Sequence, residues 1–163
     1  MLKAYGFLKK KRNDIDLVIA GKGNISPYMA LINETNPVVI NRYISDSEVS
    51  DFFDADNVIF VHPYKSASQS GVVAVSLAFK NFIVVSDVGG IREQLGNGMV
   101  GVYFEPNNDL DLAYKINKLI NDEGLQQKQL EKMDILKKSL DWSGNIKKLM
   151  DELLSNLDDE GGC

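Results

Sequence analysis

The stretch from Phe60 to Glu93 decides the fold, and it reads FVHPYKSASQSGVVAVSLAFKNFIVVSDVGGIRE. An apolar, β-branched run at 58–61 predicts a buried strand, and a loop rich in Ser and Gly follows it at 66–71. A helical segment then begins at Gly71. Because a helix start offers unpaired N–H groups and a favourable dipole, this stretch predicts a site for a phosphate or pyrophosphate.

The same alternation of apolar runs and helical patterns extends along the chain. We expect strands at 17–20, 38–40, 58–61, 82–85 and 100–104. We expect helices at 2–12, 27–36, 45–53, 71–80, 91–95, 109–121, 125–140 and 145–157. Ser45 and Glu48 have the spacing of a capping box at the start of one of these helices.

This order predicts an α/β fold: a doubly wound, Rossmann-like parallel sheet with helices on both faces and a helical C-terminal end. We expect one domain over residues 1–157. Residues 158–163 form an acidic, glycine-containing tail, native or added, to which we assign no function.

Composition and charge narrow the class of partner. The net charge of −5 argues against nucleic acid as the main partner, since nucleic-acid sites need clustered Lys and Arg. The basic run Lys9–Arg12 is the exception, and it is either a solvated helix end or a contact with anionic lipid. Cys163 is the single cysteine, so no internal disulfide can form and a cytoplasmic setting is favoured. No apolar run is long enough to cross a bilayer.

In a doubly wound sheet, ligands bind at the carboxyl ends of the strands, so the loops there hold the candidate residues. Each candidate also has a purely structural interpretation, such as a tight turn or a solvated side chain. The candidates for phosphate and sugar contacts are Lys65, Gln69, Ser70, Gly71 and Val72. Those for the nucleotide base are Arg42 and Tyr43, and those for further loop contacts are Gly21, Lys22 and Gly23.

Other chemistries have less support. His62, the single histidine, follows a strand directly and is either a catalytic base or a structural residue, of which we favour the second. The stretch from Asp87 to Gly90 indicates in the first place a turn that needs positive φ at glycine, and in the second place a contact with the sugar. No spacing of His, Cys or carboxylates indicates a metal site, and the absence of G-x-G-x-x-G argues against a nicotinamide cofactor. A flavodoxin-like or receiver-like domain would share the sheet but fits less well.

Five segments together resemble the donor-binding half of glycosyltransferase family 4, whose members are retaining enzymes with the two-Rossmann GT-B architecture. These segments are the strand with Gly-Lys-Gly at 17–23, SDSEVSDFFDADNVIFVHPY at 45–64, SQSGVVAVSLAFKNFIVVSDVGGIRE at 68–93, GVYFEP at 101–106 and DWSGNIKKLMDELL at 141–154. The resemblance covers nearly the whole chain. It is strongest to enzymes of capsule and surface-polysaccharide synthesis.

The resemblance also implies roles for particular positions. Family members carry two glutamates eight residues apart, of which the first contacts the transferred sugar and the second holds the ribose. Aligned through Gly71 and Asp87, those positions are Ser68 and Ser76 here. Serine can still form a hydrogen bond but brings no charge, so the catalytic residues of this chain are left unassigned.

A second departure concerns the start of the sequence. Family members have a strand before the first helix, followed by an Arg and a Lys that neutralise the pyrophosphate. This sequence begins inside that helix, so we expect the first strand, both cations and the acceptor-binding half to be supplied elsewhere, and this piece alone to be inactive.

The resemblance implies transfer of a hexose from a UDP- or GDP-linked donor to a glycan or lipid-linked acceptor bound by the missing N-terminal domain. It implies no cofactor and no required metal. It places the whole enzyme in the cytoplasm, and allows for peripheral association with the inner face of the membrane. The alternative is a non-catalytic domain of the same fold that binds nucleotide sugars or serves as a scaffold.

Overall fold

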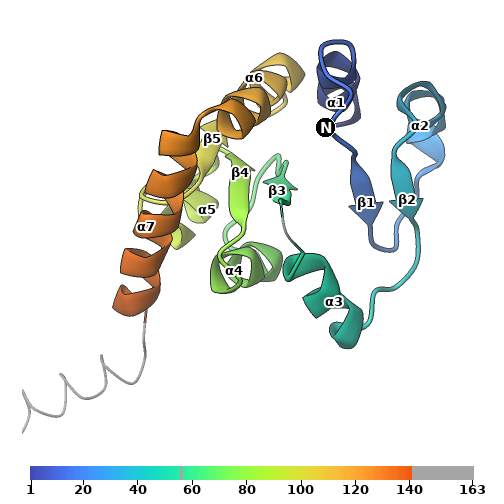
Figure 1. The fold of residues 1–163 in the computed structure, drawn as a ribbon. Helices are drawn as coiled ribbons and strands as arrows, with labels where there is room; N and C mark the ends of the chain where they lie inside the picture. The colour runs from blue at the N-terminus through green and yellow to red at the C-terminus, as the bar shows by residue number, and fades with distance from the viewer. Residues whose placement is uncertain (56, 141–163) are drawn as a thin grey trace, which may run out of the picture.

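The computed structural model describes residues 1–55 and 57–140, and Figure 1 shows how their helices and strands are arranged. The five strands are β1 (Val18–Ala20), β2 (Val38–Ile40), β3 (Ile59–His62), β4 (Phe82–Ser86) and β5 (Val102–Phe104). The helices are α1 (Leu2–Lys9), the 3₁₀ turn η1 (Ser26–Tyr28), α2 (Met29–Thr35), α3 (Asp46–Phe53), α4 (Gly71–Ala78), α5 (Gly89–Gln94), α6 (Asp109–Asn121) and α7 (Glu123–Ser139).

All strand pairs are parallel, as the alternating pattern predicts, but they form two sheets. One sheet has the order β1-β2 and the other the order β3-β4-β5. In Figure 1 the first sheet lies beside the second, with β1 and β3 as the neighbouring edge strands. The α/β class with parallel strands and flanking helices is therefore confirmed, although the described strands hydrogen-bond as two groups and not as one continuous sheet.

The core confirms helices on both faces of the larger sheet. Ile83 and Val85 of β4 pack in one buried cluster with residues of α4, α5 and α7. Val84, between them in sequence, packs in a second cluster with residues of α1 and α6. Since successive side chains of a strand point to opposite faces, these clusters are the two layers of a doubly wound domain.

Helix α7 completes the sheet in a way that the apolar pattern does not indicate. The buried side chain of Gln129 accepts a hydrogen bond from the N–H of Ile83 (3.1 Å) and donates one to its carbonyl oxygen (2.9 Å). Strand β5 begins opposite Val84, one residue after Ile83, so the amide of Gln129 satisfies backbone groups that lie beyond the end of β5.

Several predicted boundaries shift by one to three residues. Helix α1 ends at Lys9 and not at residue 12, and α4 ends at Ala78 before Lys80 adopts φ +58°. The capping box of α3 is confirmed, with the N–H of Ser45 donating to Oε2 of Glu48 (3.1 Å). The predicted helix at 145–157 and the tail at 158–163 lie outside the described residues.

The prediction for residues 87–90 is wrong in one respect. Gly89 and Gly90 form the first turn of α5, which begins two residues earlier than expected, and neither has positive φ. Gly90 is required for a different reason, which is space. A methyl group at Gly90 would lie 2.0 Å from the carbonyl oxygen of Ser68, so only a residue without a side chain fits there.

Candidate functional site

The start of α4 presents backbone donors at the carboxyl end of β3. Ser70 is the N-cap, and its Oγ accepts a hydrogen bond from the N–H of Val73 (3.3 Å). The hydroxyl of Tyr64 lies 2.6 Å from the same Oγ. In the described part of the chain, the N–H groups of Gly71 and Val72 meet no acceptor, and both residues are exposed. The geometry therefore leaves two donors available at the positive end of an eight-residue helix.

Helix α5 holds the preceding loop in place. The side-chain amide of Gln94 accepts from the N–H of Ser70 (3.0 Å) and donates to its carbonyl oxygen (2.8 Å). Gly90 packs against the backbone of Ser68, as described above. Sequence reasoning did not identify Gln94, since a lone glutamine in a short helix carries no signal of such a contact.

The two serines at the family's glutamate positions lie in different environments. Ser68 is exposed in the loop, as are Lys65 and Gln69. Ser76 is fully buried in α4, where its Oγ donates to the carbonyl oxygen of Val72 (3.0 Å) and lies 2.9 Å from Nε2 of His62. Of the two serines, only Ser68 can therefore be reached from the surface of this structure, and Ser76 cannot.

His62 is buried, and burial lowers its pKa from 6.5 to about 4. Because the single hydroxyl proton of Ser76 is directed to Val72, the hydrogen bond to Ser76 requires His62 to carry its proton on Nε2. The ring also stacks on Tyr64, with centroids 6.2 Å apart. A neutral, enclosed imidazole of this kind supports the structural interpretation of His62.

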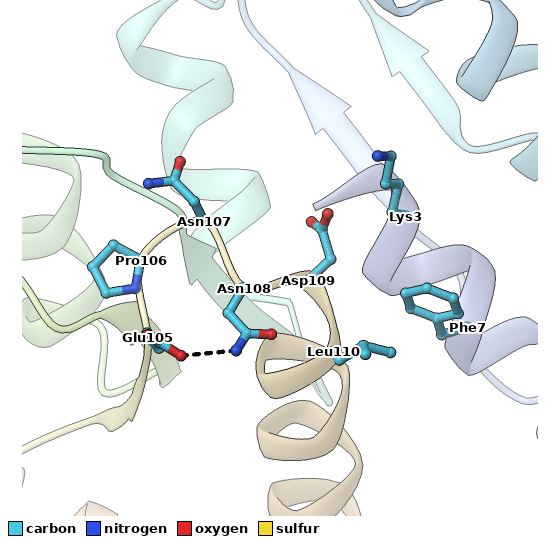
Figure 2. Close-up of a pocket in the computed structure, with 8 residues that line it drawn as sticks. All are labelled: Lys3, Phe7, Glu105, Pro106, Asn107, Asn108, Asp109 and Leu110. Atoms are coloured by element: carbon cyan, nitrogen blue, oxygen red, sulfur yellow. Dashed lines mark hydrogen bonds between the residues drawn. The ribbon is translucent and has the colours of Figure 1, made fainter.

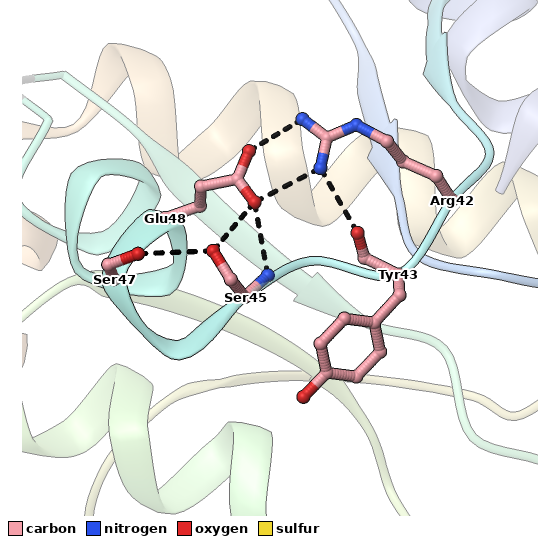
Figure 3. A network of polar contacts seen from close by, with 5 residues as sticks. All are labelled: Arg42, Tyr43, Ser45, Ser47 and Glu48. Carbon is pink, nitrogen blue, oxygen red and sulfur yellow. Dashed lines mark hydrogen bonds and ion pairs between the residues drawn. The ribbon is translucent and has the colours of Figure 1, made fainter.

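Arg42 and Tyr43 follow β2, and Figure 3 shows their contacts. The guanidinium of Arg42 pairs with Glu48 (2.6 Å) and donates to the carbonyl oxygen of Tyr43 (3.0 Å). The hydrogen bond from Arg42 lowers the pKa of Glu48 to about 2. Arg42 is thus already engaged with a carboxylate, whereas the ring of Tyr43 points away from this network and is 71% exposed.

The loop after β1 lines a cavity of about 310 Å³. Gly21, Lys22 and Gly23 contribute to its wall together with apolar residues of α1, β1 and α2. The N–H of Gly23 donates to Oδ1 of Asn41, which ties this loop to the end of β2 (2.9 Å). Gly21 has φ +133°, a conformation that L side chains rarely adopt.

A second cavity, of about 480 Å³, lies at the carboxyl end of β5, and Figure 2 shows its lining. Lys3 and Phe7 of α1 form one side, and residues 105–110 form the other. The hydrogen bond from Asn108 Nδ2 to Glu105 Oε2 (2.8 Å) fixes the turn into α6. Loop residues 65–72 line neither of these two cavities, and Gly71 and Val72, which carry the available donors of α4, are exposed.

Residues 1–55 and 57–140 contain neither a candidate metal centre nor a candidate membrane span. No group of three or more His, Cys, Asp or Glu side chains that could hold a metal ion occurs there. Within the same ranges, no helix combines the length and the apolar character that a bilayer span requires.

Comparison with known proteins gives a consistent family. Residues 1–135 match the family model described as Glycosyl transferases group 1. The chain is 25% identical over 123 residues to an uncharacterized glycosyltransferase of Methanocaldococcus jannaschii, a match that covers 72% of this chain and 31% of that protein. It is 27% identical over 133 residues to the capsular polysaccharide biosynthesis glycosyltransferase CapM of Staphylococcus aureus, covering 78% and 34%. The chain therefore spans about a third of the length of the curated relatives it matches.

Solved structures share the fold. HepE of Anabaena, crystallised in complex with UDP-glucose, matches with a TM-score of 0.72 and 16% identity over 95% of this chain and 44% of that chain. The sucrose-phosphate synthase of Thermosynechococcus elongatus matches with a TM-score of 0.62 and 17% identity over 95% and 42%. These likenesses show the fold alone, which is the Rossmann-like α/β arrangement of GT-B glycosyltransferases.

Proposed function

Since this chain belongs to the glycosyl transferases group 1, we propose that it is the donor-binding domain of a retaining enzyme of glycosyltransferase family 4. The enzyme moves a hexose from a UDP- or GDP-linked sugar to a glycan or lipid-linked acceptor. The acceptor is bound by a second domain, for which the greater length of the relatives leaves room. The similarity to a capsular polysaccharide glycosyltransferase supports a surface polysaccharide as the product.

The pair of available N–H groups at Gly71 and Val72 carries this proposal. They point outward from the positive end of α4, where Ser70 and Gln94 keep the backbone ordered. A diphosphate is the part of a nucleotide-sugar donor that such an end recognises, because each N–H can donate to a phosphate oxygen and the helix dipole favours negative charge. HepE, which shares this fold, has been crystallised with UDP-glucose.

The same arrangement suits the chemistry of transfer. When the bond from the sugar to the diphosphate breaks, negative charge builds up on the leaving phosphate. Donors that are already oriented toward that oxygen lower the barrier without reorganising. Lys65 adds a positive charge nearby in sequence, and Ser68 and Gln69 add hydrogen-bonding groups for phosphate or sugar. In this proposal no divalent metal is needed, since amides and a cation neutralise the leaving group.

The other predicted residues enter the proposal differently. The exposed ring of Tyr43 is available to stack on the nucleotide base, whereas Arg42 orders the turn through Glu48. Ser76 is buried, so it supports the start of α4 through Val72 and reaches the ribose only if this helix moves. The loop 21–23 provides the remaining contacts. We place the whole enzyme in the cytoplasm, associated peripherally with the inner face of the membrane.

One observation favours a second candidate function. Both positions of the family's glutamates hold serine, and one of these serines is enclosed in the core. A domain that kept the fold without the charged contacts would bind nucleotide sugars without transfer, or would act as a scaffold. A domain that binds nucleotide sugars without transfer would keep the phosphate site, whereas a scaffold would not need it.

Isothermal titration with UDP, GDP and their glucose and mannose derivatives tests the proposal. We expect heat of binding from at least one nucleoside diphosphate at millimolar concentration. If none of these ligands gives a heat of binding, donor binding is contradicted and the scaffold function is favoured. Binding without transfer by the longer protein would favour the non-catalytic form.

A substitution at Gly71 makes the test specific. A Cβ atom added at Gly71 would meet no atom within 4 Å, and the residue is exposed, so we expect the fold to accept a side chain there. Gly71→Asp adds a carboxylate that suits the helix dipole but repels a diphosphate. We expect unchanged thermal stability and at least about a tenfold loss of UDP affinity, which corresponds to about 1.4 kcal/mol. Gly71→Asn is the matched control, because it has the same size without the charge.

A further inference from the structure

Helices α1 and α6 lie side by side on one face of the larger sheet (Figure 1), where both contribute to the buried cluster around Val84. Phe7 of α1 and Leu110 of α6 line the cavity of about 480 Å³, and Figure 2 shows Leu110 pointing toward Phe7. Beyond the end of α1, Nη1 of Arg12 donates to Oδ1 of Asn117 (3.5 Å). Because residue 7 lies near residue 110 and residue 12 near residue 117, the two helices run parallel and their outer sides form one surface.

Exposed side chains recur at every fourth position of the two helices. Side chains four residues apart lie on the same side of a helix, so each series forms a row. One row belongs to α1 and the turn that follows it, and the other belongs to α6. We call the two rows the α1/α6 surface, and its six exposed members are Lys3, Phe7, Lys11, Leu110, Tyr114 and Lys118.

The middle of the α1/α6 surface is apolar. Leu110 is 65% exposed, Tyr114 is 61% exposed and Phe7 is 37% exposed. Single exposed apolar side chains are ordinary, whereas several on one surface point to a binding site. Tyrosine suits the boundary between water and an apolar phase, because its ring is apolar and its hydroxyl is polar.

The ends of the same surface are positive, although the protein carries a net charge of −5. Lys3 and Lys11 lie one turn before and one turn after Phe7, and Lys118 lies one turn after Tyr114. The two rows contain no carboxylate. The apolar residues are therefore flanked by cations on a protein that is acidic as a whole.

The carboxylates next to this surface are compensated by other groups. Asp14 pairs with Arg12. Asp111 accepts a hydrogen bond from the N–H of Glu105 (2.8 Å). Asp109 and Asp111 lie in the first turn of α6, where the helix dipole offsets negative charge. These carboxylates therefore do not cancel the charge of the lysines.

The contacts of the basic run at residues 9–12 divide it into two parts. Nζ of Lys9 lies 5.4 Å from the centroid of the Tyr5 ring, and Nε of Arg12 donates to Oδ1 of Asp14 (2.7 Å). Within residues 1–55 and 57–140, Lys10–Lys11 make no such contact and are exposed. Two cations of the run are thus engaged within the chain, and two are available to a partner.

We propose that the α1/α6 surface docks on an anionic membrane. Phe7, Leu110 and Tyr114 enter the boundary between the headgroups and the acyl chains, and the three lysines meet the phosphates of the headgroups. The lysine stems lie along the apolar boundary while their ammonium groups stay at the headgroups. A nucleic acid or an acidic protein would attract the lysines but would give the three apolar side chains no apolar environment, so a bilayer fits both properties.

The inference deepens the proposed function, on whose peripheral membrane association it rests, by naming the surface that makes the contact. It does not depend on the phosphate site. The available N–H groups lie at the start of α4, which packs in one core layer, whereas α1 and α6 pack in the other. Lipid binding and donor binding can therefore be measured, and can fail, separately.

Sedimentation of the chain with vesicles tests the proposal. Vesicles of phosphatidylcholine with about one third phosphatidylglycerol are compared with vesicles of phosphatidylcholine alone. We expect binding to the anionic vesicles to be at least about tenfold tighter than binding to the neutral ones. Most of this difference should disappear in about 0.5 M salt, which screens the attraction between the lysines and the headgroups.

Two pairs of substitutions locate the contact. Lys11→Gln combined with Lys118→Gln removes two charges, and we expect the affinity for anionic vesicles to fall by about tenfold or more. Leu110→Ala combined with Tyr114→Ala removes apolar area and should weaken vesicle binding by a similar factor of about ten. All four residues are exposed, so the thermal stability and the UDP affinity without lipid should stay those of the wild type.

Matched controls come from α7 and its C-cap, since α7 contributes Met133 and Leu136 to the other core layer. Lys128→Gln combined with Lys138→Gln changes the net charge by the same amount. Ile135→Ala combined with Leu140→Ala removes apolar side chains that are 58% and 52% exposed. We expect both control pairs to bind anionic vesicles as the wild type does.

Equal weakening by the α1/α6 pairs and the α7 pairs would overturn the proposal, and so would equal binding to neutral and anionic vesicles. A dimer in solution that Leu110→Ala with Tyr114→Ala dissociates would also overturn it, because a second copy would then cover the surface. Vesicle binding that depends on the α1/α6 pairs, in a chain that binds no nucleoside diphosphate, would contradict donor binding and support this inference.

Discussion

Gly90 lies so close to Ser68 that a Cβ atom on the glycine would be 2.0 Å from the serine carbonyl oxygen and 2.5 Å from its Cα. This approach brings the first turn of α5 against the loop that leads into α4. Since the contact is with backbone, no rotation of a side chain can relieve it. The two elements that shape the candidate phosphate site are therefore fitted to each other at one residue.

Gly90→Ala should separate the two elements. We expect a loss of about 2 kcal/mol or more in the free energy of unfolding, because the backbone of the loop must move to accommodate the methyl group. Urea denaturation measures it. Gly89→Ala is the matched control: its methyl group meets nothing within 4 Å, so the stability should stay the same or rise slightly. Equal stability of the two variants would contradict the close contact.

Gln94→Ala should loosen the loop without disturbing the core. The N–H and carbonyl of Ser70 lose their partner, and we expect a cost of about 1 kcal/mol because both groups can turn to water. If the available amides at 71 and 72 bind a diphosphate, UDP affinity should fall as well. Glu93→Ala, at the exposed neighbouring position, should change neither quantity. If Gln94→Ala keeps full UDP affinity, the hydrogen bonds between Gln94 and Ser70 do not position the N–H groups at 71 and 72.

Gln129→Ala should be among the most destabilising substitutions of a polar residue in this chain. It strips hydrogen-bond partners from two buried backbone groups of Ile83, and each unsatisfied group costs about 1–3 kcal/mol. Gln127→Ala, which breaks only an exposed contact with Glu131, should cost less than about 0.5 kcal/mol. Denaturant unfolding measures the free energy of unfolding of both variants. A similar small loss in each would refute the role of Gln129 as hydrogen-bond partner of Ile83.

The burial of His62 predicts a pH dependence. Its pKa is about 4 in the folded chain, against an ordinary value of 6.5, so the unfolded chain takes up the proton first as the pH falls. The contribution of neutral His62 to the free energy of unfolding is therefore complete above pH 6.5. It is lost as the pH falls toward 4, by at most about 3 kcal/mol. Glu48, whose pKa is lowered from 4.5 to about 2 in the folded chain, loses its stabilising effect between these two values, mostly below the window of His62.

Urea unfolding of the wild type and of His62→Gln across that range measures this effect. We expect the free energy of unfolding of the wild type to fall more steeply with decreasing pH than that of the variant. Parallel curves would mean that the imidazole accepts a proton in the folded chain as readily as in water.

The apolar runs predicted all five strands of the described residues. The signal has a clear physical basis in β4, where residues 83–85 are fully buried and carry no polar interruption. The helix start at Gly71 could be predicted for a related reason, since Ser70 is a strong N-cap directly after a loop. The start of α5 at Gly89 could not be predicted from the sequence. Two glycines disfavour a helix locally, and the contact with Ser68 that requires one of them is set by tertiary packing.

The candidate site was predictable only in its backbone. Donors at a helix start follow from local sequence, whereas Gln94 and Ser70 are 24 residues apart and meet only in the folded chain. Ser76 illustrates the same limit, because its position in α4 follows from the sequence but its enclosure against His62 depends on how that helix packs on β3. Whether Lys65, Ser68, Gln69 and Tyr43 contact a donor stays a prediction.

The bond between α7 and the sheet sets a practical limit for anyone who shortens this protein. A truncation before Gln129 would leave a central strand with two bare peptide groups, and one before Leu136 would remove Met133 and Leu136 from the buried cluster around Ile83. Expression trials that trim the carboxyl terminus should therefore stop at residue 140, and fragments that end earlier should aggregate or be degraded by proteases during purification.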